Sequence, residues 1–554
     1  MATAVAPTGG APIGLTRTAE HPAKSKAMFG KEAPATPKFE DPYANRYLIA
    51  IAVTLAAVLE LVDTSIVNVA IPHMMGTLGA TLDEITWVST SYIIANVIVI
   101  PMSGWLSAYF GRRRYLTGSI AIFVLASFFC GAATSLWGLV FWRVIQGLGG
   151  GALLSTAQST LFEAFPPEER GVGQSIFGVG VMVGPTIGPT IGGYIVDGYS
   201  WPWIFYINVP LGILAGWMVW NYVRNAAHQV KAKKVDFLGI GLLTLAVGSL
   251  QWMLERGERN DWFESRFVLA LAITSAVSTI LLVWRELTID EPIIDFRILN
   301  SRQLAPGVLF VAFLGLALYG SVFVLPVFLQ SLHGFTAWQT GKVILPGALA
   351  SAFTMAIVGK NAPKLDARPL IVTGAFLFLW SMYKMSVLTL DTGTEDLFWP
   401  LILRGVGMGL IFVPLTSATV AGLPMKDMAQ GTGMFNLLRQ LGGSMGIAII
   451  ATLLSRYSKV EKAVLTEHVG AYEPSTLERL SQLTHGLMAR GFDAITAKQQ
   501  AIAVIDRQIT AQASVLAFSK LYLVSGLLLV GALPLLFLWR TGRSQLPKGV
   551  DLPH

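Results

Sequence analysis

This 554-residue chain has little charge and almost no cysteine. Charged residues make up 13% of the sequence, about half the share usual in soluble domains, whereas hydrophobic residues make up 53%. The single cysteine, Cys130, excludes a disulfide framework and a cysteine metal site, and we interpret it as a small packing residue. The scarcity of charge excludes a soluble globular protein and predicts an integral membrane protein.

Long apolar runs recur along the chain and indicate the fold class. Residues 1–46 have no apolar periodicity and consist mainly of small residues, Pro and Lys, which predicts a disordered tail. The first apolar run begins near Tyr47, too far along the chain for a signal peptide, and is long enough to span a bilayer as an uncleaved helix. Thirteen further runs follow. The sequence therefore predicts an all-α integral membrane protein with 14 transmembrane helices.

Basic residues are distributed unevenly between the two sides of the predicted helices. The side of the N-terminus carries the basic clusters within 112–114 and 231–234, whereas the short loops of the other side carry only Arg256, Arg259 and Arg266. Basic loops usually face the cytoplasm, so both termini are expected there in a multi-pass protein of the cytoplasmic (inner) membrane. The same bias accounts for the net charge of +7 without a nucleic-acid partner.

An internal repeat appears when the chain is shifted by 258 residues. The segment "QGLGGG" at 146–151 then aligns with "RGVGMG" at 404–409, and Gly173 aligns with Gly431. Because this offset spans eight predicted helices, a six-helix unit repeated in the same orientation, with two helices between the copies, explains it. Duplicated halves of this kind are a transporter architecture, in which the substrate site lies between the halves.

The repeat and the loops together give the expected domain boundaries. They are a cytoplasmic tail at 1–46, an N-terminal six-helix half at 47–224, a cytoplasmic linker with two extra helices at 225–287, a C-terminal six-helix half at 303–540 that includes an outer helical segment at 456–514, and a cytoplasmic tail at 541–554.

Several motifs, in order along the chain, resemble those of the major facilitator superfamily. "GWLSAYFGRRR" is similar to its loop motif between helices 2 and 3, "RVIQGLGGG" to its helix 4 motif and "GPTIGPTIGG" to its antiporter motif in helix 5. Together with "LVDTSIVNVAIP" in helix 1 and fourteen spans, they resemble the drug:proton antiporter branch. Within it, "SLQWMLERGERNDWFES" and "GYSWPWIFYINVP" are most similar to EmrB-type multidrug efflux pumps.

Two acids interrupt the first apolar run. Ionised and facing lipid, Glu60 and Asp63 would each cost about 2.5 to 3.5 kcal/mol, so they are expected to face the interior or to be neutral. Their spacing of three places both on one helix face, where mutual repulsion favours proton uptake by one of them. Both are candidates for proton coupling, with a structural ion pair as the alternative. Asp63 matches the family's helix 1 acid, whereas Glu60 lies outside that pattern and could also recognise a cationic substrate. Arg143 matches the family's helix 4 arginine, which the resemblance implicates in proton transfer.

Two glycine-containing motifs suggest gating. The resemblance assigns Gly184, Gly188, Pro189, Gly192 and Gly193 to a seal between the halves, although glycines four residues apart also serve close helix packing. In the loop between helices 2 and 3, the residues that fit the gating motif are Gly104, Gly111, Arg112 and Arg113. Ala108 stands where the family usually has an acid, so the charge interaction of that acid is absent or replaced.

The resemblance also implies a large apolar and aromatic substrate cavity. Its candidate residues, which could equally be packing residues, are Asn68, Trp87, Tyr92, Gln158, Tyr319, Phe323, Gln330, Asn436, Arg404 and Arg439. The implied ligands are protons and amphiphilic or cationic drugs.

The outer segment at 456–514 reads as helical, with breaks at Pro474 and Gly491. It could pack on the protein itself or contact a partner, and the resemblance suggests an EmrA-like periplasmic adaptor and, through it, an outer-membrane channel.

No motif indicates an enzyme. The chain has no Walker loop, and its histidines lack metal-ligand spacing, so no cofactor is expected and the proton motive force is the expected energy source. We expect a secondary active multidrug exporter that exchanges protons for amphiphilic toxic compounds. The alternatives are a dedicated exporter of one endogenous metabolite or siderophore and a non-transporting membrane scaffold or sensor.

Overall fold

The computed structural model describes residues 43, 45–225, 235–470 and 472–539, and every regular element in these ranges is a helix. The expected tails at 1–46 and 541–554, apart from the residues at the start of the first helix, and the linker at 226–234 lie outside the described residues. The α-helices are α1 (Arg46–Leu78), α2 (Leu82–Ile85), α3 (Trp87–Phe110), α4 (Arg112–Gly131), α5 (Leu136–Ala164), α6 (Arg170–Gly198), α7 (Trp203–Tyr206), α8 (Asn208–Tyr222), α9 (Phe237–Arg256), α10 (Arg266–Thr288), α11 (Leu304–Leu332), α12 (Ala337–Asn361), α13 (Ala367–Met385), α14 (Thr394–Val420), α15 (Met428–Glu467), α16 (Pro474–Met488), α17 (Ala494–Gly531) and α18 (Leu535–Leu538).

Short 3-10 helices complete the described elements. They are η1 (Glu258–Asn260), η2 (Trp262–Glu264), η3 (Phe296–Asn300), η4 (Ala362–Lys364) and η5 (Met425–Asp427).

The number of long helices agrees with the predicted fold. In the described ranges, twelve helical segments are long and apolar enough to cross a membrane. Two more long helices, α5 and α13, pack among them but are not in that set. Helix α5 carries many glycines and the buried polar residues Arg143 and Gln146, which lower its hydropathy. With these two, the described part of the chain has the fourteen predicted spans, and the all-α membrane fold is confirmed.

The repeat seen in the sequence is also a repeat of helices. Helices α1, α5 and α6 begin at residues 46, 136 and 170, and α11, α14 and α15 begin 258 residues later, at 304, 394 and 428. The packing repeats as well, because α1 packs along α6 and α11 packs along α15. Each copy of the repeat therefore contains one such packed pair, α1 with α6 in the first copy and α11 with α15 in the second.

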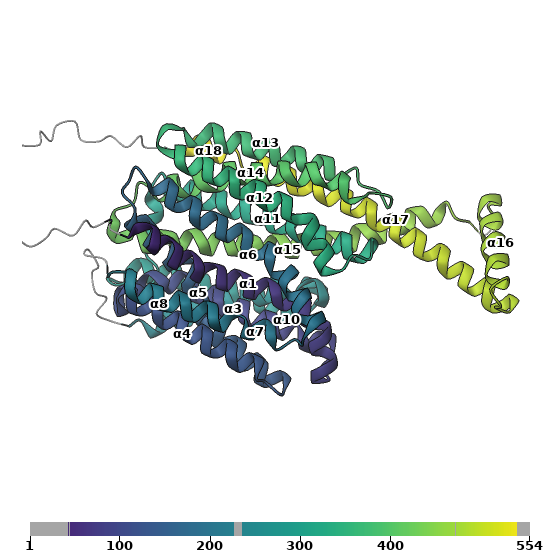
Figure 1. Cartoon of the computed structure of the whole chain (residues 1–554), viewed down its shortest axis with the longest axis horizontal. Helices are drawn as coiled ribbons and strands as arrows, with labels where there is room; N and C mark the ends of the chain where they lie inside the picture. The colour runs from purple at the N-terminus through teal and green to yellow at the C-terminus, as the bar shows by residue number, and fades with distance from the viewer. Residues whose placement is uncertain (1–42, 44, 226–234, 471, 540–554) are drawn as a thin grey trace, which may run out of the picture. The chain divides into compact units, whose positions relative to one another are not determined.

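Two groups of helices form the body from residue 45 onward. Figure 1 shows α3, α4, α5, α7 and α8 in one group, α11 to α14 and α17 in the other, and α6 and α15 between them. Helix α6 packs on α12 and α14 of the other group, and α15 packs on α3 and α5. The contact between the groups is therefore made largely by the two repeat-related helices.

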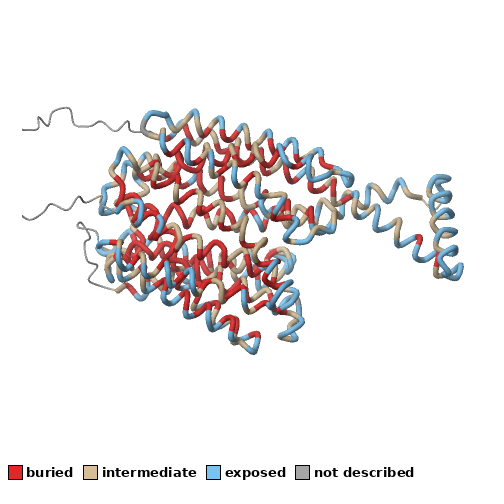
Figure 2. The backbone as a smooth tube through the Cα atoms, in the orientation of Figure 1, coloured by how far each residue is buried: buried red, intermediate tan, exposed pale blue. Residues whose placement is uncertain are grey.

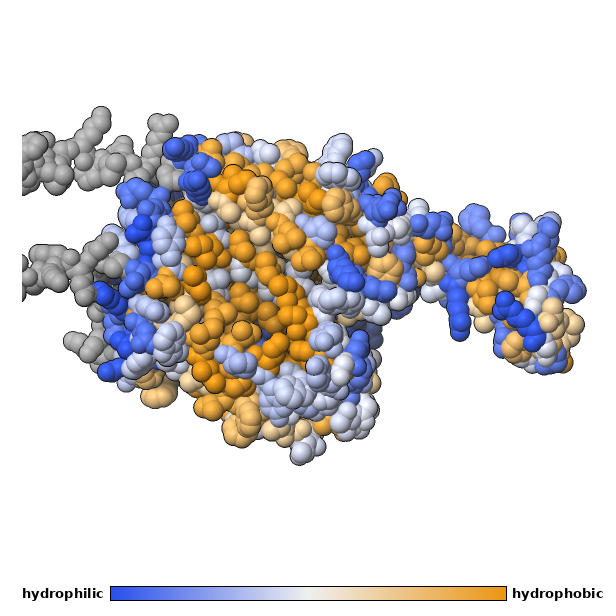
Figure 3. Space-filling view, in the orientation of Figure 1, coloured by the Kyte–Doolittle hydropathy of each residue, from blue (hydrophilic) through white to orange (hydrophobic). Residues whose placement is uncertain are grey.

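The burial pattern is that of a bundle with an apolar exterior. Buried residues follow the inner faces of the helices (Figure 2), and large apolar side chains such as Leu125, Trp284 and Phe353 are exposed on the outside. The space-filling view shows a broad hydrophobic area over the bundle, with hydrophilic residues toward both ends (Figure 3). This distribution fits a surface that faces lipid tails.

One end of the bundle carries a group of basic side chains, and we call it the basic end. Arg46 at the start of α1 pairs with Glu169 just before α6, and Arg112 at the start of α4 pairs with Glu163 near the end of α5. Helix α16 lies beyond the opposite end (Figure 1). The structure therefore places the start of α1 and the helical hairpin at opposite ends.

The predicted outer segment is helical and extends away from the bundle. Helix α15 continues to Glu467, α16 begins at Pro474, and Gly491 lies between α16 and α17 with φ of 97°, a conformation that favours glycine. Both predicted breaks therefore lie at helix boundaries. Ion pairs between Lys462 and Asp506 and between Lys520 and Glu461 connect α15 with α17.

Candidate functional site

Helix α1 places both acids of the first span in the interior. Asp63 is fully buried and Glu60 is 6% exposed, so neither carboxyl faces lipid. The apolar neighbours of these acids form the helix, and the spacing of three residues directs both side chains to the same side. The expectation that the acids avoid lipid is thus met by burial inside the N-terminal helix group.

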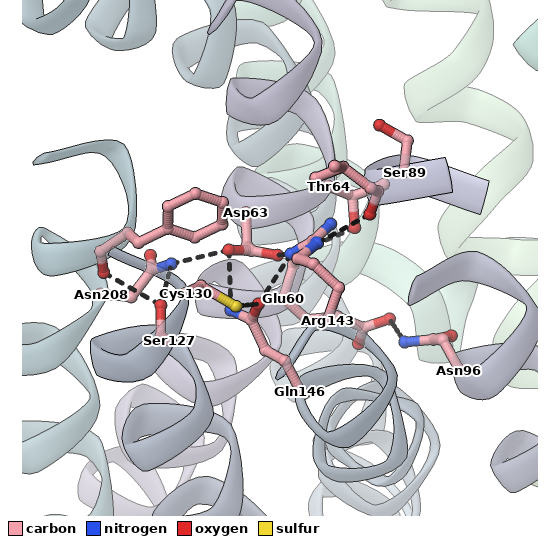
Figure 4. A network of polar contacts seen from close by, with 12 residues as sticks. Glu60, Asp63, Thr64, Ser89, Asn96, Ser127, Cys130, Arg143, Gln146 and Asn208 are labelled. Atoms are coloured by element: carbon pink, nitrogen blue, oxygen red, sulfur yellow. Dashed lines mark hydrogen bonds and ion pairs between the residues drawn. The ribbon is translucent and has the colours of Figure 1, made fainter. Parts of the chain in front are cut away.

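Asp63 lies in a network of hydrogen bonds from three donors (Figure 4). Arg143 Nη1 donates to Oδ2 at 2.6 Å, Gln146 Nε2 donates to Oδ1 at 2.9 Å, and Asn208 Nδ2 donates to Oδ1 at 2.8 Å. The donors come from α5 and α8. The Asp63 carboxyl group is therefore bound by side chains of two other helices at once and connects α1 with α5 and α8.

Arg143 is held on more than one side. Its Nη1 also donates to Gln146 Oε1 at 2.7 Å, its Nε donates to the Val88 carbonyl at 3.0 Å, and its guanidinium lies 4.0 Å from the centre of the Tyr92 ring. The side chain is 1% exposed and forms its ion pair with Asp63. The guanidinium therefore bridges α1, α3 and α5.

Glu60 has a much poorer set of partners. Its Oε1 accepts a hydrogen bond from Asn96 Nδ2 at 2.9 Å, whereas its buried Oε2 has no hydrogen-bond partner in the described part of the chain. The two acids of α1 therefore differ: Asp63 is saturated with donors, and Glu60 has a free oxygen. A buried polar atom without a partner is unfavourable, so the protein leaves the hydrogen-bonding capacity of Glu60 partly unfilled in this conformation.

A second group of polar residues crosses between the helix groups. Asn436 on α15 donates to Gln158 Oε1 on α5 at 2.6 Å. On the same helix, Arg439 donates through Nη1 to Tyr319 Oη at 2.7 Å and through Nε to Asn436 Oδ1 at 3.4 Å. Glu60 is within electrostatic range of Arg439 but does not form an ion pair with it. Four predicted cavity residues are thus brought together.

The other predicted cavity residues lie apart. Trp87 contacts Trp252 of α9 and lies beneath the Arg256 guanidinium. Phe323 packs against the larger hydrophobic core and Gln330 is exposed, while the remaining three have separate environments. Those three are Asn68, which accepts from Ser89, Tyr92, which lies under Arg143, and Arg404, which lies in electrostatic range of Tyr522.

Three glycines of the predicted seal lie against α1 of their own half. An added Cβ at Gly184, Gly188 or Gly192 would contact Leu61, Ser65 or Ile66 of α1, in the same half of the molecule. The stripe therefore allows α1 and α6 to pack closely, because three glycines on one face leave room for a neighbouring backbone.

The last glycine of the motif does lie near the other half. A Cβ on Gly193 would be 3.5 Å from Ala337 of α12. Pro189 lies inside α6 without breaking it. The direct contact between the halves at this motif therefore involves Gly193 and not the three stripe glycines.

The predicted gating motif begins within α3, and its Gly104 lies against α15. A Cβ on Gly104 would lie 3.0 Å from the backbone nitrogen of Gln430, so only glycine allows this approach without adjustment. Gly111 has φ of 85°, and Arg112 pairs with Glu163. The Arg113 guanidinium lies 4.2 Å from the Trp220 ring, within its own half.

Sequence reasoning missed several residues of the network around Asp63. Gln146, Asn208 and Asn96 are buried and hydrogen-bond directly to one of the two acids. Their signal was present, since each is an amide within an apolar helix, where an unpaired polar group is costly. The sequence could not show that α5, α8 and α3 direct them to the same two carboxylates.

The described residues contain no group of three or more His, Cys, Asp and Glu that could hold a metal ion. Cys130 is buried, and its Sγ donates to Gln146 Oε1 at 3.6 Å. It belongs to the network as a neighbour of Gln146 and is fully buried, in agreement with a packing role.

A repeated helical bundle with an apolar exterior, two buried acids and a polar connection between its halves defines the class of membrane transporters. The chain matches the model of the Major Facilitator Superfamily over residues 53–447, and it belongs to this family. It is a multi-pass membrane transporter and not an enzyme.

Curated relatives cover nearly the whole chain. The Multidrug export protein EmrB of Escherichia coli (strain K12) is 35% identical over 492 residues, which cover 88% of this chain and 94% of that protein. The Fatty acid resistance protein FarB of Neisseria gonorrhoeae is 31% identical over 493 residues, covering 88% and 95%. The chain is thus EmrB-like, as its motifs suggested.

A solved structure agrees on the fold. The crystal structure of the human organic anion transporter MFSD10 (TETRAN) aligns with a TM-score of 0.56 and 13% sequence identity, covering 87% of this chain and 99% of that chain. At this identity the likeness concerns the fold alone.

Proposed function

We propose that this protein exports amphiphilic toxic compounds in exchange for protons. The proposal is supported by its similarity to proteins named for multidrug export and by the buried acids of α1. Protons would supply the energy, and no ATP or cofactor is required. The drug:proton exchange is the function that best uses a titratable group enclosed between two halves of a transporter.

The observation that carries this proposal is the difference between the two acids. Asp63 has three donors and an ion pair, so its charge is balanced in the observed conformation. Glu60 has one side-chain donor, Asn96, its Oε2 has no hydrogen-bond partner in the described part of the chain, and Arg439 of α15 lies within electrostatic range. We assign proton uptake and release in this conformation to Glu60, and we propose that Asp63, which here maintains the network with Arg143, takes up its proton in a later step of the cycle.

Proton exchange can be coupled to movement through the Asp63 and Arg143 pair. Protonation of Asp63 would remove the charge that holds the guanidinium, because a neutral carboxyl binds arginine more weakly. Arg143 would then move relative to α1, and release of the proton would restore the pair. Each cycle moves protons down their gradient, and one elementary charge moving inward yields about 2.3 kcal/mol per 100 mV.

The contacts between the halves suggest how access alternates. Near the basic end, Gly171 approaches the Gly359 carbonyl closely and Gly104 approaches Gln430. Toward the middle, Gln158 bonds to Asn436. We propose that these contacts close the basic end in this conformation and that rocking of the halves opens them. By the positive-inside rule, we place the basic end and both termini in the cytoplasm and the protein in the inner membrane.

Everted membrane vesicles test the exchange. With a pH-sensitive dye, addition of an amphiphilic cationic drug should cause proton movement with the wild-type protein. The Asp63→Asn and Glu60→Gln variants should each lose most of this drug-evoked signal at matched expression. Full exchange in both variants would contradict the assignment of the proton path to α1.

The outer hairpin is the proposed contact for an adaptor. Helix α16 has no buried residue, and Leu477 and Met488 on it are 49% and 42% exposed. We propose that this helix binds an EmrA-like periplasmic adaptor that leads to an outer-membrane channel. Cross-linking from a photoreactive residue at position 477 should capture that adaptor, and position 221 on α8 serves as a control on the bundle.

A narrower substrate range is the second candidate. A dedicated exporter of one endogenous metabolite would use the same proton site, and the similarity to a protein named for fatty acid resistance favours considering it. Export of several chemically unrelated dyes from one reconstituted preparation would count against it.

A further inference from the structure

We propose that the C-terminal half contains a subsite for the anionic head of an amphiphile, in which Arg439 and Tyr319 bind a carboxylate. This inference rests on the proposed export function and specifies a substrate class for it. The class is a carboxylate with an apolar chain, in addition to the cationic compounds expected from the acids of α1.

Arg439 is a buried cation without an acidic partner. Its side chain belongs to a residue that is 4% exposed, and its hydrogen bonds go to the neutral groups Tyr319 Oη and Asn436 Oδ1. In the described part of the chain it forms no ion pair. A guanidinium has five N–H donors, so two hydrogen bonds leave donors for a further acceptor. A buried charge without compensation is unfavourable, and a bound anion would compensate it.

The described part of the C-terminal half as a whole, like Arg439, has buried positive charge without buried negative charge. Within the described residues 304–539, the buried charged side chains are Arg404 and Arg439, and no acid is buried there. Arg404 Nη1 also has no hydrogen-bond partner, and Tyr522 Oη nearby has none. The buried charged side chains of this half are therefore both basic, whereas the N-terminal half buries the acids Glu60 and Asp63 together with Arg112 and Arg143.

The internal repeat shows how this contrast is built. At the shift of 258 residues, Asp63 on α1 corresponds to Ser321 on α11, and Gln146 on α5 corresponds to Arg404 on α14. Ser321 donates to the Leu318 carbonyl of its own helix. At the same shift Glu60 corresponds to Leu318 and Arg143 to Leu401, and each half has two buried arginines. The second half therefore differs from the first in having no acid at the positions of Glu60 and Asp63, and this leaves its buried positive charge without a buried negative charge.

Glu60 is the nearest candidate for a protein counter-charge, and its state decides whether the subsite is available. It lies within electrostatic range of Arg439 but makes no ion pair with it. When Glu60 is protonated, Arg439 has no negative charge to balance it. A carboxylate ligand can then bind, and a singly charged head matches the one guanidinium at this position.

Tyr319 lies on α11, whose other side chains are mostly apolar, so an apolar chain on that head would meet apolar neighbours there. Tyr319 lies with its ring near the guanidinium, 5.9 Å from its centre, and its hydroxyl is fixed by Arg439. A carboxylate would bond to both groups, since the phenol can donate its proton to an oxygen anion.

Two ligands with equal chains and opposite charge test the subsite. Binding of decanoate and of decyltrimethylammonium is measured on the full-length protein in nanodiscs of zwitterionic lipid, for wild type, Arg439→Gln, Arg439→Lys and Tyr319→Phe. Arg439→Gln should weaken decanoate binding about tenfold or more, because a charge-assisted bond is lost, and should leave decyltrimethylammonium within about twofold. Arg439→Lys should recover part of the decanoate affinity. The control is Lys384→Gln, which removes an exposed cation from α13.

Four results would overturn the subsite. The first is that the wild-type protein binds the cation but not decanoate, and the second is that Arg439→Gln weakens the binding of both ligands equally. The third is that the Lys384→Gln control loses as much decanoate affinity as Arg439→Gln, and the fourth is that Arg439→Lys binds decanoate no more tightly than Arg439→Gln. The last two would indicate a nonspecific charge effect or a structural role. Failure of the proposed function is a separate outcome: proteoliposomes would then move neither ligand against a gradient, whatever their binding.

Discussion

Asp63 accepts three hydrogen bonds from side chains of α5 and α8, whereas Glu60 accepts one side-chain hydrogen bond, from Asn96. At the residue scale, this difference separates two acids that the sequence treats alike. Burial without partners costs a carboxylate its hydration, whereas three donors offset that loss for Asp63. The two acids therefore differ in how fully their carboxyl oxygens are hydrogen-bonded.

Asn208 provides a test of the network that leaves both acids in place. Asn208→Ala removes one donor to Asp63 and one hydrogen bond to Ser127 Oγ, and it should destabilise the protein by about 1.5 to 3 kcal/mol, as expected for a bond to a charged group. Thermal unfolding in detergent measures this, together with a reduced drug-evoked proton signal.

Asn221→Ala is the matched control for that substitution. Asn221 lies on the same helix but is exposed and donates to the Trp217 carbonyl of α8. Asn208→Ala should lower the unfolding temperature more than Asn221→Ala does. Equal losses would show that the hydrogen bond to Asp63 stabilises the protein no more than an exposed side-chain hydrogen bond does.

At the scale of elements, the packing of α1 on α6 depends on glycine. A Cβ at Gly188 would lie 3.2 Å from the Val62 carbonyl and would overlap Ser65, so the helices could not keep their separation. The stripe was expected between the halves and instead fixes the distance within one half. Close helix packing of this kind places Glu60 and Asp63 on a rigid support.

Gly188→Val should destabilise the protein by about 1 to 3 kcal/mol, because extra atoms in a tight contact force the helices apart. The unfolding temperature measures this loss. Gly118→Val on α4 is the control, since a Cβ there meets nothing within 4 Å. An equally large loss for the control would contradict the packing argument.

The start of α17 depends on a capping acid outside the membrane-spanning part. Hydrogen bonds from Thr496, and from the backbone of Ile495, lower the pKa of Asp493 below its ordinary value of 3.8. A lowered pKa means that the stabilisation is present at neutral pH and is lost as the pH falls through the folded value.

Asp493→Ala should therefore loosen the first turn of α17 at pH 7. Hydrogen exchange of residues 494–497, compared with wild type at each pH, should show a difference that shrinks below pH 3.8. A difference that persisted unchanged into acid would show that the carboxylate charge is not the source of the cap.

At the scale of the whole molecule, α6 and α15 contact the opposite half, and Gln158 and Asn436 connect the halves by a bond of 2.6 Å. Movement of the halves must break this bond. In the cycle that we propose, a small set of polar and glycine contacts would be exchanged for others while each half stays folded.

A covalent link at this position should stop the cycle. In a Cys130→Ala background, the Gln158→Cys and Asn436→Cys pair, joined by a short thiol cross-linker, should lose transport while each single variant keeps it. Transport is measured in proteoliposomes before and after a cleavable linker is reduced. Undiminished transport by the linked protein would show that the halves do not separate here.

The fold was predictable because it depends on local composition. Fourteen apolar segments, two helix breaks at Pro474 and Gly491 and a repeat of 258 residues can be read along the chain, since a span must satisfy its own backbone hydrogen bonds whatever its neighbours are. The family membership followed from motifs on those helices.

The site was only partly predictable because it depends on which helices face each other. The sequence by itself determined that Glu60 and Asp63 face the interior or are neutral, since an ionised acid of an apolar helix is costly where it faces lipid. Only the tertiary structure decided that Asn208 and Gln146 share one carboxylate, that Glu60 keeps a free oxygen, and that the glycine stripe faces α1. The physical reason is that a helix's sequence fixes its own period and polarity, whereas its rotation and neighbours are set by packing with distant segments.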